Sequence, residues 1–228
     1  MTRRHAHEPA PRPYRIAVAI IRFIVRLLRW RVDAAGMEQV PPRGPVLLVA
    51  NHVSYLDPIL LGIPLDAAGR TVRYLAKREM FDHWFTGPVV RGADQILVDR
   101  KGDAGAALRH AEAALANGKM LVIYPEGTIH PVFDAANAKT GAARLALATG
   151  VPVLPAVAWG GQQIGTKTGG VRVGAGTAHL VRVGPPIPYD PDDTVEDLTA
   201  RIMAAIGVLL TEVAADHPTD LGPAVAVR

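Results

Sequence analysis

The chain has no cysteine among its 228 residues. Disulfide bonds, thiolate nucleophiles and cysteine-ligated zinc are therefore excluded, and a reducing compartment is permitted. Serine is nearly absent too: Ser54 is the only one, and there is no G-x-S-x-G sequence for a serine hydrolase. The eight histidines include no H-x-x-x-H or H-E-x-x-H spacing. The sequence therefore predicts no metal site.

Acidic residues are scarce at the N-terminus, where Glu8 is the only one in the first 31 residues. Eight arginines lie in the same stretch: Arg3, Arg4, Arg12, Arg15, Arg22, Arg26, Arg29 and Arg31. The rest of the chain carries 17 basic and 20 acidic residues, so the whole net charge of +4 comes from this end. This asymmetry favours contact with an anionic membrane surface at one end and argues against a nucleic-acid-binding domain.

Residues 14–31 form a helical pattern without a long apolar run. Their longest run, 16–21, has six residues, whereas a transmembrane helix needs about 20. At about 100° per residue, four arginines fall within roughly 60° of one another, and the remaining circumference is apolar beyond the width that docking requires. We predict an amphipathic helix packed partly on its own domain and partly in lipid headgroups. A helix docked wholly on the domain is the alternative. Arginines within the apolar stretch disfavour a signal peptide.

After Gly44-Pro45, strand and helix patterns alternate. Strands are predicted at 46–50, 71–76, 95–98, 119–123 and 151–159, and a terminal hairpin or edge strands within 168–184. Helices are predicted at 58–65, 78–90, 103–116, 139–149 and 193–214. This order predicts an α/β fold with a mixed central sheet covered by helices. The boundaries expected are a disordered tail with the basic helix (1–36), one catalytic domain (37–216) and a loose C-terminal tail (217–228).

The segment Asn51-His52-Val53-Ser54-Tyr55-Leu56-Asp57 follows an apolar strand and contains an H-x-x-x-x-D motif. A histidine paired with a carboxylate can act as a base towards an alcohol, because the carboxylate fixes the tautomer and stabilises the imidazolium. A purely structural interpretation also exists. Asp57 before Pro58 is suited to begin a helix as its N-cap, and His52 can be an ordinary polar residue at a strand end.

Four blocks together resemble the lysophosphatidic acid acyltransferase family of glycerolipid acyltransferases. They are the H-x-x-x-x-D segment, then Gly92-Ala93-Asp94-Gln95-Ile96-Leu97-Val98-Asp99-Arg100, Tyr124-Pro125-Glu126-Gly127-Thr128 and Val151-Pro152-Val153-Leu154-Pro155. They occur in the family's order over roughly residues 40–190. The resemblance implies transfer of a fatty acyl group from acyl-CoA or acyl carrier protein to a lysophosphatidate hydroxyl. It implies no cofactor beyond this co-substrate.

The resemblance also implies site residues. His52 is the general base and Asp57 its partner, and Glu126, Gly127 and Thr128 belong to the substrate-binding site. There Glu126 is expected to orient a cation or to accept hydrogen bonds from the backbone or the acceptor hydroxyl. Resemblance and charge together nominate four cations for the acceptor phosphate: Lys77, Arg100, Lys139 and Arg144. Backbone N–H groups near Gly127 are candidates for the oxyanion site. One departure is that Ile129 stands where the family has arginine, which leaves another lysophospholipid or a glycolipid open as the acceptor.

We therefore expect a 1-acylglycerol-3-phosphate O-acyltransferase on the cytoplasmic face of the cell membrane, held there peripherally or monotopically by residues 14–31. A lipid hydrolase that uses water activated by His52 and Asp57 is a second possibility, and a non-enzymatic membrane adaptor is a third. Trp84 and Phe85 lie in an apolar stretch, for which we predict core packing, with an acyl groove as the alternative.

Overall fold

The computed structural model describes residues 10–84, 86–99, 104–130, 132–166, 170–171 and 175–216. Within them a seven-stranded sheet has the order β1-β9-β6-β2-β5-β3-β4. All neighbouring pairs are parallel except β6 and β9, which are antiparallel. The strands are β1 (Arg31–Ala35), β2 (Val46–Ala50), β3 (Val72–Lys77), β4 (Ile96–Val98), β5 (Met120–Ile123), β6 (Val153–Trp159) and β9 (Ala178–Val183). A separate hairpin pairs β7 (Gly165–Thr166) with β8 (Gly170–Val171).

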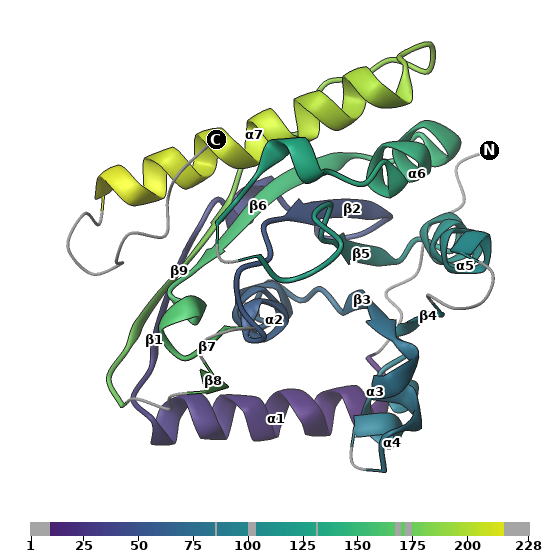
Figure 1. Cartoon of the computed structure of the whole chain (residues 1–228). Coiled ribbons are helices and arrows are strands. Elements are labelled where there is room, and N and C mark those ends of the chain that lie inside the picture. Colours follow the sequence, from purple (N-terminus) through teal and green to yellow (C-terminus); the bar gives the residue numbers. More distant parts are fainter. Residues whose placement is uncertain are drawn as a thin grey trace.

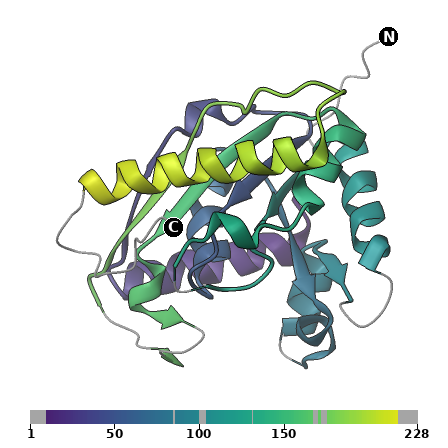
Figure 2. The ribbon, with the colours of Figure 1, turned by 45° about the horizontal axis from the view of Figure 1, so that its top comes forward.

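Helices cover both faces of this sheet (Figures 1 and 2). One face carries α5 (Ala104–Ala116), α6 (Gly141–Thr149) and α7 (Val195–Asp216), and the other carries α2 (Asp57–Ala67). Helix α1 (Arg12–Leu27) lies outside α2, beside α4 (Thr86–Gly92), which follows α3 (Arg78–Asp82). The predicted mixed α/β sheet covered by helices is confirmed.

The central strands form because their sequences are apolar throughout. Every residue of β2, β5 and β6 is buried, as expected for strands covered on both faces. Alternate side chains then enter two cores. Leu47 and Val49 of β2 pack towards α6 and α7, whereas Val46 and Leu48 pack towards α2.

Most predicted elements are present, with three differences. The helix predicted over 78–90 is two helices, α3 and α4. The predicted helix 14–31 ends at Leu27, and 31–35 forms β1, which the sequence analysis did not predict. β9 is not an edge strand, because β1 pairs with its outer side. The tails predicted to be disordered or loose fall largely outside the described residues, which exclude 1–9 and 217–228.

One helix among the described residues is long and apolar enough to span a membrane: Val195–Ala215, with a mean hydropathy of 1.7. Its inward side chains belong to the core on the α6 face of the sheet, among them Leu198, Ile202 and Leu210. We therefore treat α7 as a core helix of the domain.

The sheet topology positions the candidate site. Because β6, β2, β5, β3 and β4 run parallel, their carboxyl ends share one edge. Open α/β sheets bind ligands at this edge. The segment containing His52 follows β2, and the segment containing Glu126 follows the neighbouring β5.

Candidate active site

The site is built around the pair formed by His52 and Asp57. The Nδ1 atom of His52 lies 2.9 Å from Oδ2 of Asp57. This contact assigns the proton of neutral His52 to Nδ1, which leaves Nε2 as the basic nitrogen. The histidine side chain is 16% exposed and the aspartate side chain is fully buried. The imidazole is therefore partly open to solvent, whereas its partner is not.

Asp57 holds the whole loop that precedes α2. Its Oδ2 also accepts the backbone N–H groups of Val53 and Ser54, each at 2.8 Å. Burial raises the pKa of Asp57, while its bonds to His52 and to these two N–H groups act in the opposite direction by stabilising the carboxylate. Both N–H groups precede Asp57 in the chain, and Leu56 rather than Asp57 is the N-cap residue of α2, so the N-cap interpretation is wrong.

Two neighbouring side chains fix the same loop to β6 and the turn after it. The amide of Asn51 donates to the carbonyl of Ala158 at 3.1 Å and accepts its N–H at 2.9 Å, which extends the pairing of β2 and β6 by one step. Ser54 is buried, and its hydroxyl donates to the carbonyl of Gly161 at 2.8 Å. Ser54 therefore has a structural role, and the serine-hydrolase alternative is disfavoured further.

The segment after β5 surrounds His52 on its other sides. The rings of His52 and Tyr124 are stacked, with centroids 4.1 Å apart and planes 16° apart. Oε1 of Glu126 accepts the backbone N–H of His52 at 2.7 Å, and the N–H of His130 donates to the carbonyl of His52 at 2.9 Å. Sequence reasoning did not include Tyr124 among the site residues. The only signal was its place at the start of the P-E-G-T block.

Glu126 is 2% exposed, and its Oε2 is buried without a hydrogen-bond partner among the described residues. Burial raises the pKa of Glu126 to about 8, with smaller contributions in the same direction from the negative charges of Asp57 and Asp134. The His52 N–H acts in the opposite direction. Its surroundings therefore favour the protonated, uncharged form of Glu126.

Gly127 follows Glu126 in the same segment, and the stem of Lys139 lies against it. Gly127 has a φ of +69°, and a Cβ there would lie 3.3 Å from Cγ of Lys139. The N–H of Lys139 donates to the carbonyl of Pro125 at 2.7 Å, and its side chain is exposed. The Gly127 N–H donates to the backbone carbonyl of Tyr124 at 2.9 Å. That N–H is therefore engaged within the turn, which argues against Gly127 itself as an oxyanion donor.

The other nominated residues are less closely tied to His52. Lys77 ends β3 at the same sheet edge and is exposed, two strands from β2. Thr128 is partly buried beside Gly127. Arg144 is exposed on α6, where its Nε donates to the Thr140 hydroxyl at 3.2 Å. Arg100 lies outside the described residues.

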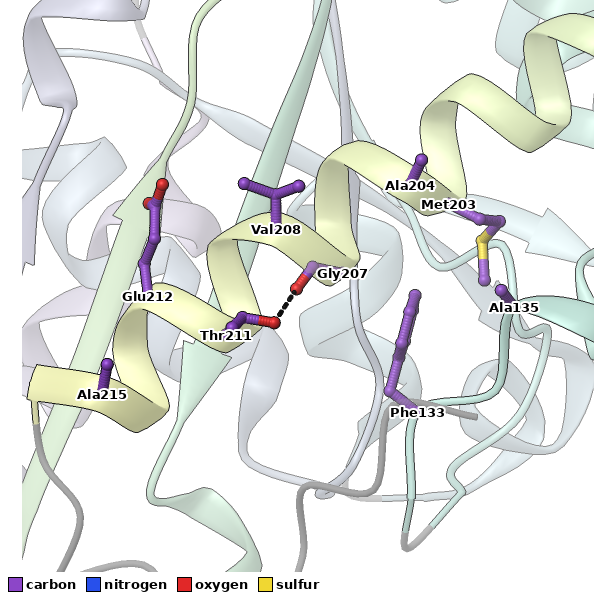
Figure 3. A pocket seen from close by; sticks show the side chains of 9 residues that line it. All are labelled: Phe133, Ala135, Met203, Ala204, Gly207, Val208, Thr211, Glu212 and Ala215. Carbon is purple, nitrogen blue, oxygen red and sulfur yellow. Dashed lines mark hydrogen bonds between the residues drawn. The ribbon is translucent and has the colours of Figure 1, made fainter.

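An open apolar groove of about 520 Å³ lies elsewhere, between α7 and the segment around Phe133 (Figure 3). Met203, Gly207, Val208 and Thr211 line it from α7. The Thr211 hydroxyl donates to the Gly207 carbonyl at 2.9 Å, so its polar atom is satisfied within the helix. None of the nominated site residues lines this groove.

Comparisons with known proteins identify the family of the chain. Residues 31–159 match the Acyltransferase family. The 1-acyl-sn-glycerol-3-phosphate acyltransferase alpha of Homo sapiens is 33% identical over 192 residues, which cover 82% of this chain and 66% of that protein. The 1-acyl-sn-glycerol-3-phosphate acyltransferase of Borreliella burgdorferi is 26% identical over 147 residues, or 62% of this chain and 58% of that protein.

A solved structure supports the fold. The crystal structure of the 1-acyl-sn-glycerophosphate (LPA) acyltransferase PlsC from Thermotoga maritima matches with a TM-score of 0.71 at 24% identity, covering 89% of this chain and 80% of that one. The seven-stranded sheet and its covering helices thus have the fold of that structure. The chain belongs to the Acyltransferase family. It spans just under two thirds of the human relative.

Proposed function

We propose that the protein transfers a fatty acyl group from an acyl thioester, acyl-CoA or acyl carrier protein, to the free hydroxyl of lysophosphatidate, giving phosphatidate. The observation that carries this proposal is the 2.9 Å contact between His52 and the buried Asp57, which leaves Nε2 as the basic nitrogen of a partly exposed imidazole. The names of the human and bacterial relatives support the choice of acceptor.

The reaction needs one base and no covalent enzyme intermediate. Nε2 of His52 takes the proton from the acceptor hydroxyl while its oxygen attacks the thioester carbonyl. The tetrahedral oxyanion then collapses, the carbon–sulfur bond breaks, and the imidazolium returns the proton to the departing thiolate. A thiol ionises at about pH 8.5, so the leaving group needs little further activation. Asp57 holds the ring and stabilises the imidazolium.

Lys139 is our first choice for the acceptor phosphate in the absence of the family arginine. Ile129 is buried and apolar, so it makes no charged contact with a phosphate. The Lys139 stem lies against Gly127, one residue from Glu126, and its ammonium end is exposed. Lys77 is our second choice because β3 ends at the same edge of the sheet. Another lysophospholipid or a glycolipid is the alternative acceptor.

We propose that α1 holds the domain on an anionic membrane. Five large apolar side chains at helical spacing are 42–68% exposed: Ile16, Ile20, Phe23, Ile24 and Leu27. The opposite side of the helix faces the domain, where Tyr14 is buried and Arg22 pairs with Asp66 at 2.7 Å. An apolar stripe flanked by arginines matches the composition of helices that lie in lipid headgroups.

The α3–α4 corner extends this proposed membrane face. Helix α4 packs against the start of α1, where a Cβ on Gly92 would come within 2.5 Å of Pro13. Trp84 is 82% exposed and Met80 is 43% exposed. The prediction of core packing for Trp84 is therefore wrong, and Phe85 lies outside the described residues. Tryptophan is enriched at membrane interfaces, which supports this placement.

The test is thiol release from oleoyl-CoA by the purified protein with phospholipid vesicles, with lysophosphatidate, lysophosphatidylcholine or no acceptor. The proposal expects release only with an acceptor, fastest with lysophosphatidate, and phosphatidate as the product. His52→Ala and Asp57→Asn should lower the rate by about 10²–10⁴ while the melting temperature of His52→Ala stays close to wild type. Exposed Asp192→Asn serves as the control. Release without acceptor, yielding free fatty acid, would show a hydrolase instead.

A further inference from the structure

The backbone of His52 is bound on both sides by the segment that follows β5. Its N–H donates to Oε1 of Glu126 at 2.7 Å, and its carbonyl accepts the N–H of His130 at 2.9 Å. Both contacts cross between neighbouring strands, since Val49 of β2 pairs with Ile123 of β5. The Glu126 contact is the only one of these two made by a side chain, so it can be changed by substitution.

The surroundings of Glu126 disfavour a second negative charge. Asp57 on α2 and Asp134 before η2 (Ala135–Asn137) both act on its carboxyl group, and the group is 2% exposed. His52 contributes a backbone N–H, and Lys139 contributes its stem beside Gly127. Burial raises the pKa of Glu126 to about 8, so the neutral form prevails at pH 7.

We propose that Glu126 is a positioning residue that works as a neutral carboxylic acid, fixing the backbone of His52 without contacting the acceptor. Oε1 needs no charge to accept the N–H of His52. An ionised Glu126 would add a second negative charge beside Asp57, in a site where acyl transfer itself generates an oxyanion, and would oppose the formation of that oxyanion. Above about pH 8 the rate of acyl transfer should therefore fall as this group loses its proton.

This inference rests on the proposed function, because it assigns Glu126 to the positioning of the general base. It differs from the acceptor-site role implied by the family resemblance, which would require a polar atom of Glu126 to face the substrate. The geometry commits Oε1 to His52 and leaves Oε2 buried without a partner among the described residues. If Glu126 bound the acceptor, its replacement would raise the KM for the acceptor. If it positions His52, its replacement would lower kcat.

The experiment compares wild type, Glu126→Gln and Glu126→Ala in the oleoyl-CoA and lysophosphatidate assay from pH 6 to 9.5. Glutamine keeps an oxygen that can accept the His52 N–H, and it cannot ionise. The kcat of Glu126→Gln should therefore stay within about threefold of wild type, and its plot of kcat against pH should lack the fall above pH 8. Alanine should lower kcat by about tenfold to a hundredfold, because a buried N–H loses its partner. Its KM for lysophosphatidate should change less than about twofold. Glu112→Gln, an exposed change on α5, should behave as wild type throughout.

Two results would overturn the inference: a large rise in the KM for lysophosphatidate in both variants with kcat retained, or a Glu126→Gln profile that falls above pH 8 as wild type does. If Glu126→Ala does not fold, the glutamine profile still decides. A His52→Ala control separates the two proposals. Undiminished turnover in that variant would contradict the proposed function itself, whatever Glu126 does.

Discussion

The imidazole of His52 lies face to face with the ring of Tyr124, with centroids 4.1 Å apart, and the rings of Tyr74 and Tyr124 are nearly parallel, with centroids 6.4 Å apart. The Tyr74 hydroxyl donates to the carbonyl of Pro58 at 2.6 Å, which ties the stack to α2. An aromatic face beside a histidine limits the rotation of its ring and attracts the imidazolium formed during the reaction. The ring of the proposed base is therefore held by Asp57 at its edge and by Tyr124 at its face.

Replacing Tyr124 separates the ring from the hydroxyl. Tyr124→Phe should retain wild-type kcat, because the tyrosine hydroxyl is buried without a hydrogen-bond partner among the described residues. Tyr124→Leu should lower kcat by about tenfold, within the range expected for loss of a desolvated contact of about 1–2 kcal/mol between a cation and a ring. Steady-state kinetics in the thiol-release assay measure this difference. Equal rates for the phenylalanine and leucine variants would argue against a role for the ring.

Gly127→Ala should weaken both the fold and the acceptor site. Its φ of +69° is a left-handed conformation, which costs an alanine about 1–2 kcal/mol. The new methyl group would also press on Cγ of Lys139 at 3.3 Å. Gly69→Ala is a matched control, since Gly69 has a φ of +79° with nothing within 4 Å of the added Cβ. Denaturant titration should show similar destabilisation of the two variants, and only Gly127→Ala should raise the KM for lysophosphatidate.

A charge placed in the apolar stripe of α1 should release the protein from membranes. Phe23 is 66% exposed, and Phe23→Glu removes apolar area from the proposed lipid contact while adding a negative charge near anionic headgroups. We expect cofloatation with anionic vesicles to drop about tenfold or more. Val208→Glu is the control, because Val208 is 58% exposed on α7, on the other face of the sheet. If both variants bind vesicles as wild type does, α1 is not the membrane contact.

The stability of the fold should decrease with acid because of His179. This histidine is fully buried on β9, the strand between β1 and β6. Burial lowers its pKa to about 4. In the unfolded chain its pKa is about 6.5, so between these values the unfolded state binds more protons. The free energy of unfolding therefore falls as pH falls from about 6.5 to 4, by up to about 3 kcal/mol. Denaturant titrations of His179→Gln should show a shallower pH dependence than wild type, and His83→Gln, an exposed change, should not alter it.

Part of the site was determined by the sequence, because its residues are neighbours in the chain. His52 and Asp57 are five positions apart at the junction of a buried strand and a helix. The turn that the chain makes there suffices to bring the imidazole to the carboxylate. The α/β fold with a mixed central sheet was likewise predictable, since the apolar runs of β2, β5 and β6 are typical of strands covered on both faces.

Only the tertiary structure decided what surrounds the pair. Tyr124 and Glu126 contact His52 across more than 70 residues because β5 pairs with β2 in register, which no local pattern encodes. The same holds for β1, a five-residue segment that forms a strand by pairing with the outer edge of β9. The spacing of apolar residues along one segment shows which of its side chains are buried. Strand pairing determines which distant side chains meet, and here it placed a buried acid and an aromatic ring against the proposed base.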